Sequence, residues 1–184
     1  IDNTSIAKSV YADSYAETPP STADPIVRVG DTVTYDLTLN LQEYTTRSVA
    51  VEDVLPAGMV YDSLVSITPA SGNPFTYSVV SQPVANDTTL RWVFNDIINT
   101  PSNDNTPIDA LVIRYVAKVV TAAPPAGVVY DTSILRDNRA KLSYTGGDPA
   151  LYSRLTATER IDVRQPLMST ITKVDLGAGR TGAG

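Results

Sequence analysis

A strict alternation of apolar and polar side chains over residues 32–41 constrains the fold more than any other feature of this chain. Its apolar members are Val33, Tyr35, Leu37, Leu39 and Leu41. A second stretch, residues 110–120, places its apolar side chains on one face and Arg114 and Lys118 on the other. A period of two predicts strands with one buried face and one solvent-exposed face. In a helix, the apolar side chains of one face would recur every three or four residues instead.

Shorter segments rich in Thr, Val and Tyr lie between clusters of Pro, Gly, Asn and Asp, a pattern typical of short strands and turns. The further strands predicted in this way are residues 5–12, 48–54, 59–67, 75–81, 89–94, 128–134, 138–144 and 154–163. No segment has a convincing helical period. We therefore predict an all-β fold, an immunoglobulin-like β-sandwich of about 8–10 strands.

The length of 184 residues suits one well-buried core and is short for two. We predict one domain over residues 1–166. In residues 167–184, the sequence Ile171-Thr172-Lys173 repeats the Ile-x-Lys of Ile6-Ala7-Lys8 before a Gly-rich end. This second unit is predicted to be a linker or the first strand of a following repeat.

The composition excludes many kinds of catalytic and binding site. The chain has no Cys and no His, which removes thiol nucleophiles, soft metal ligands and the imidazole base. A net charge of −6 leaves no basic face for nucleic acid. No nucleophile with an activating base can be named, so we predict a protein without a cofactor that is not a turnover enzyme.

A polar loop, residues 99–107, contains four Asn or Asp residues. It is either a cation site or a solvated connection, and the lack of EF-hand-like spacing favours the connection, so no metal site is predicted. The longest apolar stretch is interrupted by Arg114 and Lys118. We expect no membrane insertion of this fragment, with any targeting signal outside it.

One lysine stands out by its position on a predicted strand. Lys118 and Lys141 fall on polar faces, whereas Lys8 shares its face with Ile6 and Val10 and is expected to point into the core. A lone buried ammonium is costly. Lys8 must therefore lose its charge, pair with an acid, or be consumed in a chemical reaction.

The same test of alternation finds two more inward polar groups. Asp53 shares its face with Val51 and Leu55, and Asn138 shares its face with Ala140. A neutral amine, a carboxylic acid and a carboxamide in a dry core have the components of amide exchange, with ammonia as the leaving group. The product would be a Lys8–Asn138 isopeptide bond assisted by Asp53. An ordinary buried Lys8–Asp53 ion pair, capped by the Asn138 amide, satisfies the same groups.

Four segments in order resemble a known family. They are residues 29–39 (VGDTVTYDLTL), 49–58 (VAVEDVLPAG), 91–96 (RWVFND) and 138–144 (NRAKLSY). Together they resemble the isopeptide-forming domains of bacterial pilins and adhesins, which are collagen-adhesin-like fimbrial domains, and the related DUF11-type surface repeats. The resemblance covers about residues 5–163.

In that family, a first-strand Lys bonds to an Asn in a late Asn-x-Ala strand, with help from a buried Asp or Glu. The resemblance therefore implies a Lys8–Asn138 cross-link with Asp53 as the assisting acid. Two departures keep alternatives open. Asp96 is the alternate acid, because it follows the inward face of Trp92 and Phe94, and Asp137 competes with its neighbour as the bonding partner.

The resemblance also implies an extracellular, cell-surface location. The expected function is that of a structural stalk or repeat module, monomeric as an isolated domain. Its expected partners are neighbouring repeat domains of the same chain, with a host or surface ligand as a further candidate. The alternative is an adhesin module that binds a glycan or a host protein and has no cross-link. Trp92, the only Trp, is expected in the core and not on a sugar-binding surface.

Overall fold

The structure, a computed structural model, describes residues 3–14, 25–70, 75–102, 108–121, 133–146 and 156–164. For residues 133–136 and 164 it describes the backbone alone. These segments form thirteen strands and no helix, so the predicted all-β class is confirmed. No helix in the described segments is long and apolar enough to cross a membrane.

The strands vary from two to twelve residues in length. In chain order they are β1 (Ser5–Asp13), β2 (Ile26–Val27), β3 (Thr32–Gln42), β4 (Tyr44–Thr46), β5 (Ala50–Val54), β6 (Met59–Pro69), β7 (Phe75–Thr76), β8 (Val79–Ser81), β9 (Thr89–Phe94), β10 (Ile97–Asn99), β11 (Ile108–Val119), β12 (Ser133–Ser143) and β13 (Thr156–Arg164).

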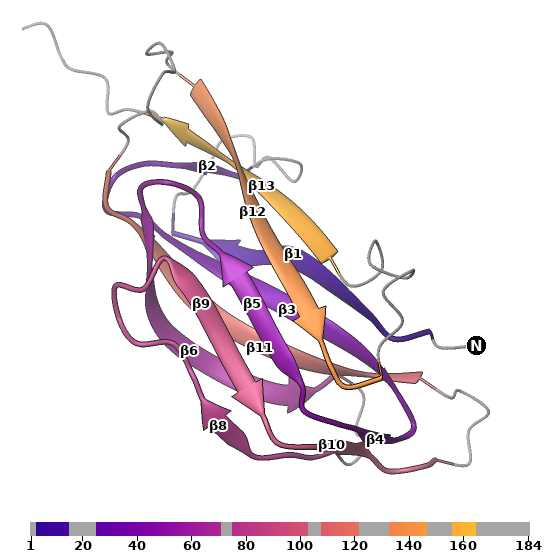
Figure 1. The fold of residues 1–184 in the computed structure, drawn as a ribbon. Helices are drawn as coiled ribbons and strands as arrows, with labels where there is room; N and C mark the ends of the chain where they lie inside the picture. The colour runs from indigo at the N-terminus through magenta and orange to yellow at the C-terminus, as the bar shows by residue number, and fades with distance from the viewer. Residues whose placement is uncertain are drawn as a thin grey trace, which may run out of the picture.

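Two large sheets face each other as a sandwich (Figure 1). One has the order β1-β3-β11-β6, and the other has the order β2-β13-β12-β5-β9-β8. Every pairing is antiparallel except that of β2 with β13. A small sheet, β4-β10-β7, lies at one end of the sandwich. The chain thus brings its first long strand, β1, close to the late strands β12 and β13.

The core lies between the two large sheets and follows the alternation in the sequence. Strands β3 and β11 alternate between buried and half-exposed residues along almost their whole length. Tyr35 and Tyr115 are cross-strand partners whose stacked ring centroids are 5.5 Å apart. The largest fully buried side chains are Trp92, Tyr35, Tyr115, Phe94, Leu37, Leu39, Leu41, Met59, Leu90, Ile97, Leu111 and Ile113. Trp92 is therefore a core residue, as expected.

In the described segments, the two large sheets contain four and six strands, ten in all, in agreement with the predicted sandwich of about 8–10, and the small sheet adds three short strands that give no readable alternation. β2, β4 and β10 have two or three residues each, and residues 75–81 form two strands instead of one. The strand expected at 138–144 begins earlier, at Ser133. Most of the strand expected at 128–134, and the second unit expected at 167–184, lie outside the described residues.

Two predicted turns depend on glycine backbone conformation. Gly30, between β2 and β3, has φ of 99°, and Gly58, between β5 and β6, has φ of 86°. Side chains with a Cβ rarely adopt such angles. Both glycines also hold β11 at its end: the Gly30 N–H donates to the Val119 carbonyl, and the Gly58 carbonyl accepts from the Val120 N–H. These turns therefore help fix the register of the sheet that carries Lys8.

Candidate cross-linking site

Four polar side chains meet between the two sheets. Lys8 on β1 and Tyr115 on β11 come from the four-stranded sheet, and Asp53 on β5 and Asn138 on β12 come from the six-stranded sheet. The side chains of Lys8 and Asp53 are fully buried, and Tyr115 and Asn138 are 0% exposed. The structure thus brings together the three residues that alternation selected, and adds a tyrosine to them.

Short hydrogen bonds connect this cluster. The Lys8 ammonium Nζ donates to Asp53 Oδ2 and, at 2.9 Å, to the hydroxyl of Tyr115. That hydroxyl donates to Asp53 Oδ2 at 2.6 Å. Asn138 Nδ2 donates to the same hydroxyl over a longer 3.4 Å. Lys8, Asp53 and the Asn138 carboxamide are therefore all joined through one tyrosine oxygen.

The burial of Lys8 changes its acid–base chemistry. Loss of water around the ammonium lowers the pKa of Lys8 to about 8, against the opposing attraction of Asp53 and of Glu159. A lysine with this pKa reaches its neutral, nucleophilic form far more easily than a surface lysine does. The cluster therefore contains an amine that can lose its proton near physiological pH.

Two oxygen atoms of the cluster have no hydrogen-bond partner among the described residues. They are Oδ1 of Asp53 and Oδ1 of Asn138, and both are buried. Buried polar atoms are normally satisfied, because leaving one unpaired costs about 1–3 kcal/mol. The cluster is therefore not a fully satisfied ion pair: the amide carbonyl has no donor in the structure.

Aromatic rings enclose the amine. Lys8 Nζ lies 4.5 Å from the ring centroid of Tyr35 and 5.3 Å from that of Tyr115. Trp92 packs on Tyr115 with ring centroids 5.3 Å apart. Burial raises the pKa of both tyrosines above the ordinary value, so their hydroxyls stay protonated. These rings exclude water from the amine.

Reasoning from the sequence missed two members of this environment. Tyr115 was predicted to face inward, but only as an apolar core residue; an inward tyrosine whose hydroxyl must find a partner was the available signal. Glu159 is the ladder partner of Asn138 on β13, and its negative charge raises the pKa of Lys8. The strand was predicted, but its inward face was not assigned.

The two alternative acids do not belong to the cluster. Asp96 lies beyond the end of β9, where the strand alternation no longer applies, and it contacts Arg47 at 3.4 Å on the surface. Asp137 points outward beside Asn138 because neighbouring side chains on a strand alternate. Its carboxylate accepts from Arg160 at 3.1 Å, and this interaction lowers the pKa of Asp137. The proposed alternate role of Asp96 is thus wrong for this fold.

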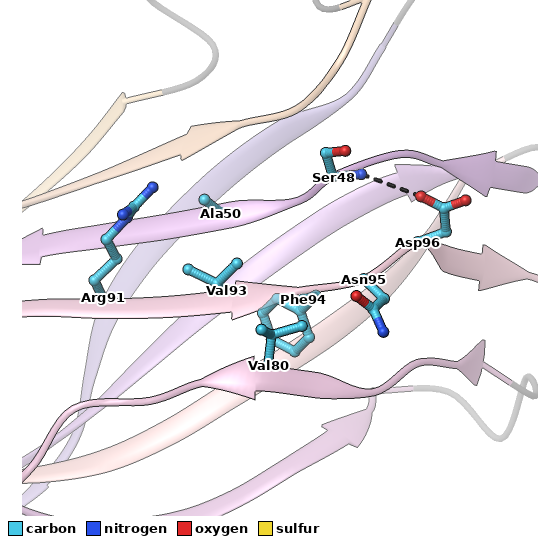
Figure 2. A pocket seen from close by; sticks show the side chains of 8 residues that line it. All are labelled: Ser48, Ala50, Val80, Arg91, Val93, Phe94, Asn95 and Asp96. Carbon is cyan, nitrogen blue, oxygen red and sulfur yellow. Dashed lines mark hydrogen bonds between the residues drawn. The ribbon is translucent and has the colours of Figure 1, made fainter.

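Asp96 instead borders an open surface groove of about 630 Å³ (Figure 2). Asp96 Oδ1 accepts from the Ser48 backbone N–H at 3.3 Å, and Asn95 Nδ2 donates to Ser78 at 2.9 Å. Val80, Val93 and other apolar groups contribute the remaining lining. Asp96 and Asn95 are thus engaged within the chain, away from the cluster around Lys8.

Metal-binding side chains do not gather in the described part of the chain: no group of three or more Asp or Glu is found there. The polar loop considered as a cation site is described only as far as Ser102, and residues 103–107 lie outside the described segments.

Comparison with known proteins gives matches in structure but not in sequence. No family model matches this chain, and no curated protein matches it in sequence. Among solved structures, the full-length major pilin SpaD from Corynebacterium diphtheriae is 13% identical, with a TM-score of 0.47. The match covers 89% of this chain and 34% of the pilin.

Two other solved structures show the range of the matches. The C-terminal fragment of the major pilin GBS80 of Streptococcus agalactiae is 13% identical over 89% of this chain and 56% of that fragment, with a TM-score of 0.45. The bacterial hydrophobin BslA is 14% identical over 89% of this chain and 95% of its own, with a TM-score of 0.41. This chain spans less than two thirds of either pilin chain. At such TM-scores the matches carry no argument about function.

Proposed function

We propose that this chain is a structural stalk or repeat module of a bacterial cell-surface adhesin or pilus-like protein, located outside the cell. An intramolecular isopeptide bond between Lys8 and Asn138, formed once by the domain itself, stabilises it. The observation behind this proposal is the buried cluster of Lys8, Asp53 and Asn138 between the two sheets, with an amide carbonyl that has no donor among the described residues.

The reaction requires Lys8 to lose two protons in total. The first moves from the ammonium to Asp53 Oδ2, its hydrogen-bond partner, which leaves a neutral amine and a neutral acid. The amine lone pair then attacks Cγ of Asn138, and the carbonyl electron pair moves to Oδ1. A protonated Asp53 is the donor available to that oxygen, whose developing charge it would stabilise.

The new Nζ–Cγ bond replaces the Cγ–Nδ2 bond. As the latter breaks, its electron pair stays on Nδ2, which takes up the second proton of Lys8 and leaves as ammonia. Burial in a water-free site and fixed positions on four strands provide the high effective molarity that this exchange needs. No cofactor is needed, and the domain performs a single turnover on itself.

The bond would also explain a mechanical role. It would join β1 in one sheet to β12 in the other, and would close a loop that spans 130 residues from residue 8 to residue 138. Pulling force would then pass through the covalent link and bypass most of the sandwich. A stalk that connects neighbouring repeat domains under load needs this property.

Intact-mass spectrometry of the purified domain tests the proposal. We expect a mass lower than the calculated mass by one ammonia, and the full mass for Lys8→Ala, Asn138→Ala and Asp53→Ala. Glu159→Gln is the matched control, because it removes a nearby acid that does not contact Lys8 in the cluster, and it is expected to lose ammonia. A full mass for the wild-type domain contradicts the cross-link and leaves an ordinary ion pair.

A further inference from the structure

The hydroxyl of Tyr115 occupies a central position among the reacting groups. It lies 2.9 Å from Lys8 Nζ, the atom that attacks, and 3.4 Å from Asn138 Nδ2, the atom that leaves. It also lies 2.6 Å from Asp53 Oδ2, the atom that receives the first proton. Tyr115 thus contacts both nitrogen atoms between which the second proton has to travel.

We propose that Tyr115 is a catalytic residue that relays the second proton of Lys8 to the leaving nitrogen of Asn138. This inference rests on the cross-linking function proposed above and adds a fourth participant to it. The phenol oxygen accepts a proton from Nζ while its own hydrogen passes to Nδ2. The tyrosine is neutral before and after the step, and one ammonia leaves.

The direction of the hydrogen bonds fits this sequence of events. Before the reaction, the Tyr115 hydroxyl donates to the Asp53 carboxylate, so its hydrogen points away from Asn138. Once Asp53 has taken the first proton from Lys8, its Oδ2 is no longer a charged acceptor that holds the tyrosine hydrogen, and the acid proton can turn toward Asn138 Oδ1. The tyrosine hydrogen is then free to turn toward Nδ2, which becomes a basic amine only after the attack.

Other groups are poorly placed for the same task. Asp53 already holds the first proton. Tyr35 is the nearest rival, because its hydroxyl interacts with the Asn138 side chain as well as with the Met59 sulfur at 4.0 Å. However, no hydrogen bond among the described residues joins it to Lys8 Nζ, the atom that must give up the second proton. Burial raises the pKa of Tyr115 well above its ordinary value, so the phenol keeps its proton until Nδ2 requires it.

The test compares rates of ammonia loss for wild type, Tyr115→Phe and Tyr61→Phe. Each protein is made by cell-free translation and stopped in denaturant at intervals, and its intact mass is measured. Tyr115→Phe removes one oxygen and keeps the ring, so the core packing is retained. Tyr61→Phe is the matched control, because its ring packs 6.1 Å from that of Tyr115 without a bond to the cluster.

We expect Tyr115→Phe to slow ammonia loss by about 100-fold or more, the usual effect of general acid–base catalysis, while Tyr61→Phe keeps the wild-type rate. Equal rates for wild type and Tyr115→Phe overturn the relay and leave the cross-link standing. No ammonia loss from wild type overturns both. Circular dichroism establishes whether Tyr115→Phe folds.

A second measurement tests the relay if Tyr115→Phe fails to fold. Replacing all tyrosines with 3-fluorotyrosine keeps their shape and lowers the phenol pKa, so a relay through Tyr115 predicts a changed rate of ammonia loss. An unchanged rate in the folded, fluorinated protein contradicts the proposal.

Discussion

Two ion pairs of this sandwich, one on an outer face and one between the sheets, have opposite characters. On the outer face of the four-stranded sheet, Arg114 binds Asp36 through two hydrogen bonds of 2.7 and 2.8 Å, and the guanidinium lies 3.3 Å from the ring centroid of Tyr11. Each carboxylate oxygen of Asp36 has its own donor. In the core, Lys8 and Tyr115 both bind Asp53 Oδ2, and Oδ1 has no partner among the described residues.

The two pairs therefore differ in how completely their carboxylate oxygens are hydrogen-bonded and in how easily the cation loses its proton. Arginine stays charged and matches a carboxylate in two places, which gives a stable surface pair. Lysine loses its proton readily on burial, and here a carboxamide lies beside it. Partial satisfaction of a buried polar cluster is costly. Substitutions at the inner and outer pairs should therefore differ in how much they lower the free energy of unfolding.

Lys8→Ala is expected to destabilise the domain most. It removes the cross-link, whose closure of a long loop is worth about 5 kcal/mol by the chain-entropy treatment used for disulfides. It also removes the Lys8 nitrogen that donates to Asp53 Oδ2 and leaves that buried acid with one hydrogen bond fewer, a defect that costs about 1–3 kcal/mol. Chemical denaturation and protease resistance should show a folded but much weaker domain. Stability equal to that of wild type would contradict this account.

Asn138→Ala is expected to have the second largest effect. The cross-link is lost, but Lys8 keeps its ion pair with Asp53, so only the loop-closure contribution of about 5 kcal/mol disappears. Its unfolding free energy should therefore fall between those of wild type and Lys8→Ala. If Asn138→Ala equals wild type in a denaturation experiment, no bond is present to be lost.

The Asn138→Ala variant should also become more stable as pH rises above 8. Its free Lys8 has a folded-state pKa of about 8 and an unfolded value of 10.5. Between these values the unfolded chain binds more protons, so the free energy of unfolding increases with pH. Relative to wild type, whose cross-linked Lys8 no longer titrates, stability should rise by on the order of 1 kcal/mol between pH 8 and about 9.5. A parallel pH dependence of the two proteins would contradict the free amine.

Arg114→Gln is expected to have the smallest effect. The pair with Asp36 lies on a partly exposed face, where solvent screens the charges, so the melting temperature should stay close to that of wild type. The mass should still be lower by one ammonia, since this pair does not touch the cluster. A large loss of stability would contradict the contrast drawn between the two pairs.

The sequence predicted those parts of the fold in which alternation runs for many residues. Residues 32–41 and 89–94 match β3 and β9 almost to the residue, and the inward positions of Lys8, Asp53 and Asn138 followed from the same rule. All three are buried, and the alternation holds in the immediate neighbourhood of each, even on the five-residue strand β5.

The remaining features depended on contacts between distant strands. Asp96 was misplaced because its strand ends at Phe94, and alternation carries no information past that point. Tyr115 was placed inward, but its role depends on a hydroxyl that meets residues from β1, β5 and β12. A pattern within one strand cannot show which polar groups another sheet places opposite it.

The most direct test of the central claim is tandem mass spectrometry of a proteolytic digest of the wild-type domain. We predict one branched peptide in which the side chain of Lys8 is joined to that of Asn138, with a combined mass lower by one ammonia. Separate, unmodified peptides for Lys8 and Asn138 would contradict the account, and the buried cluster would then be an ordinary ion pair.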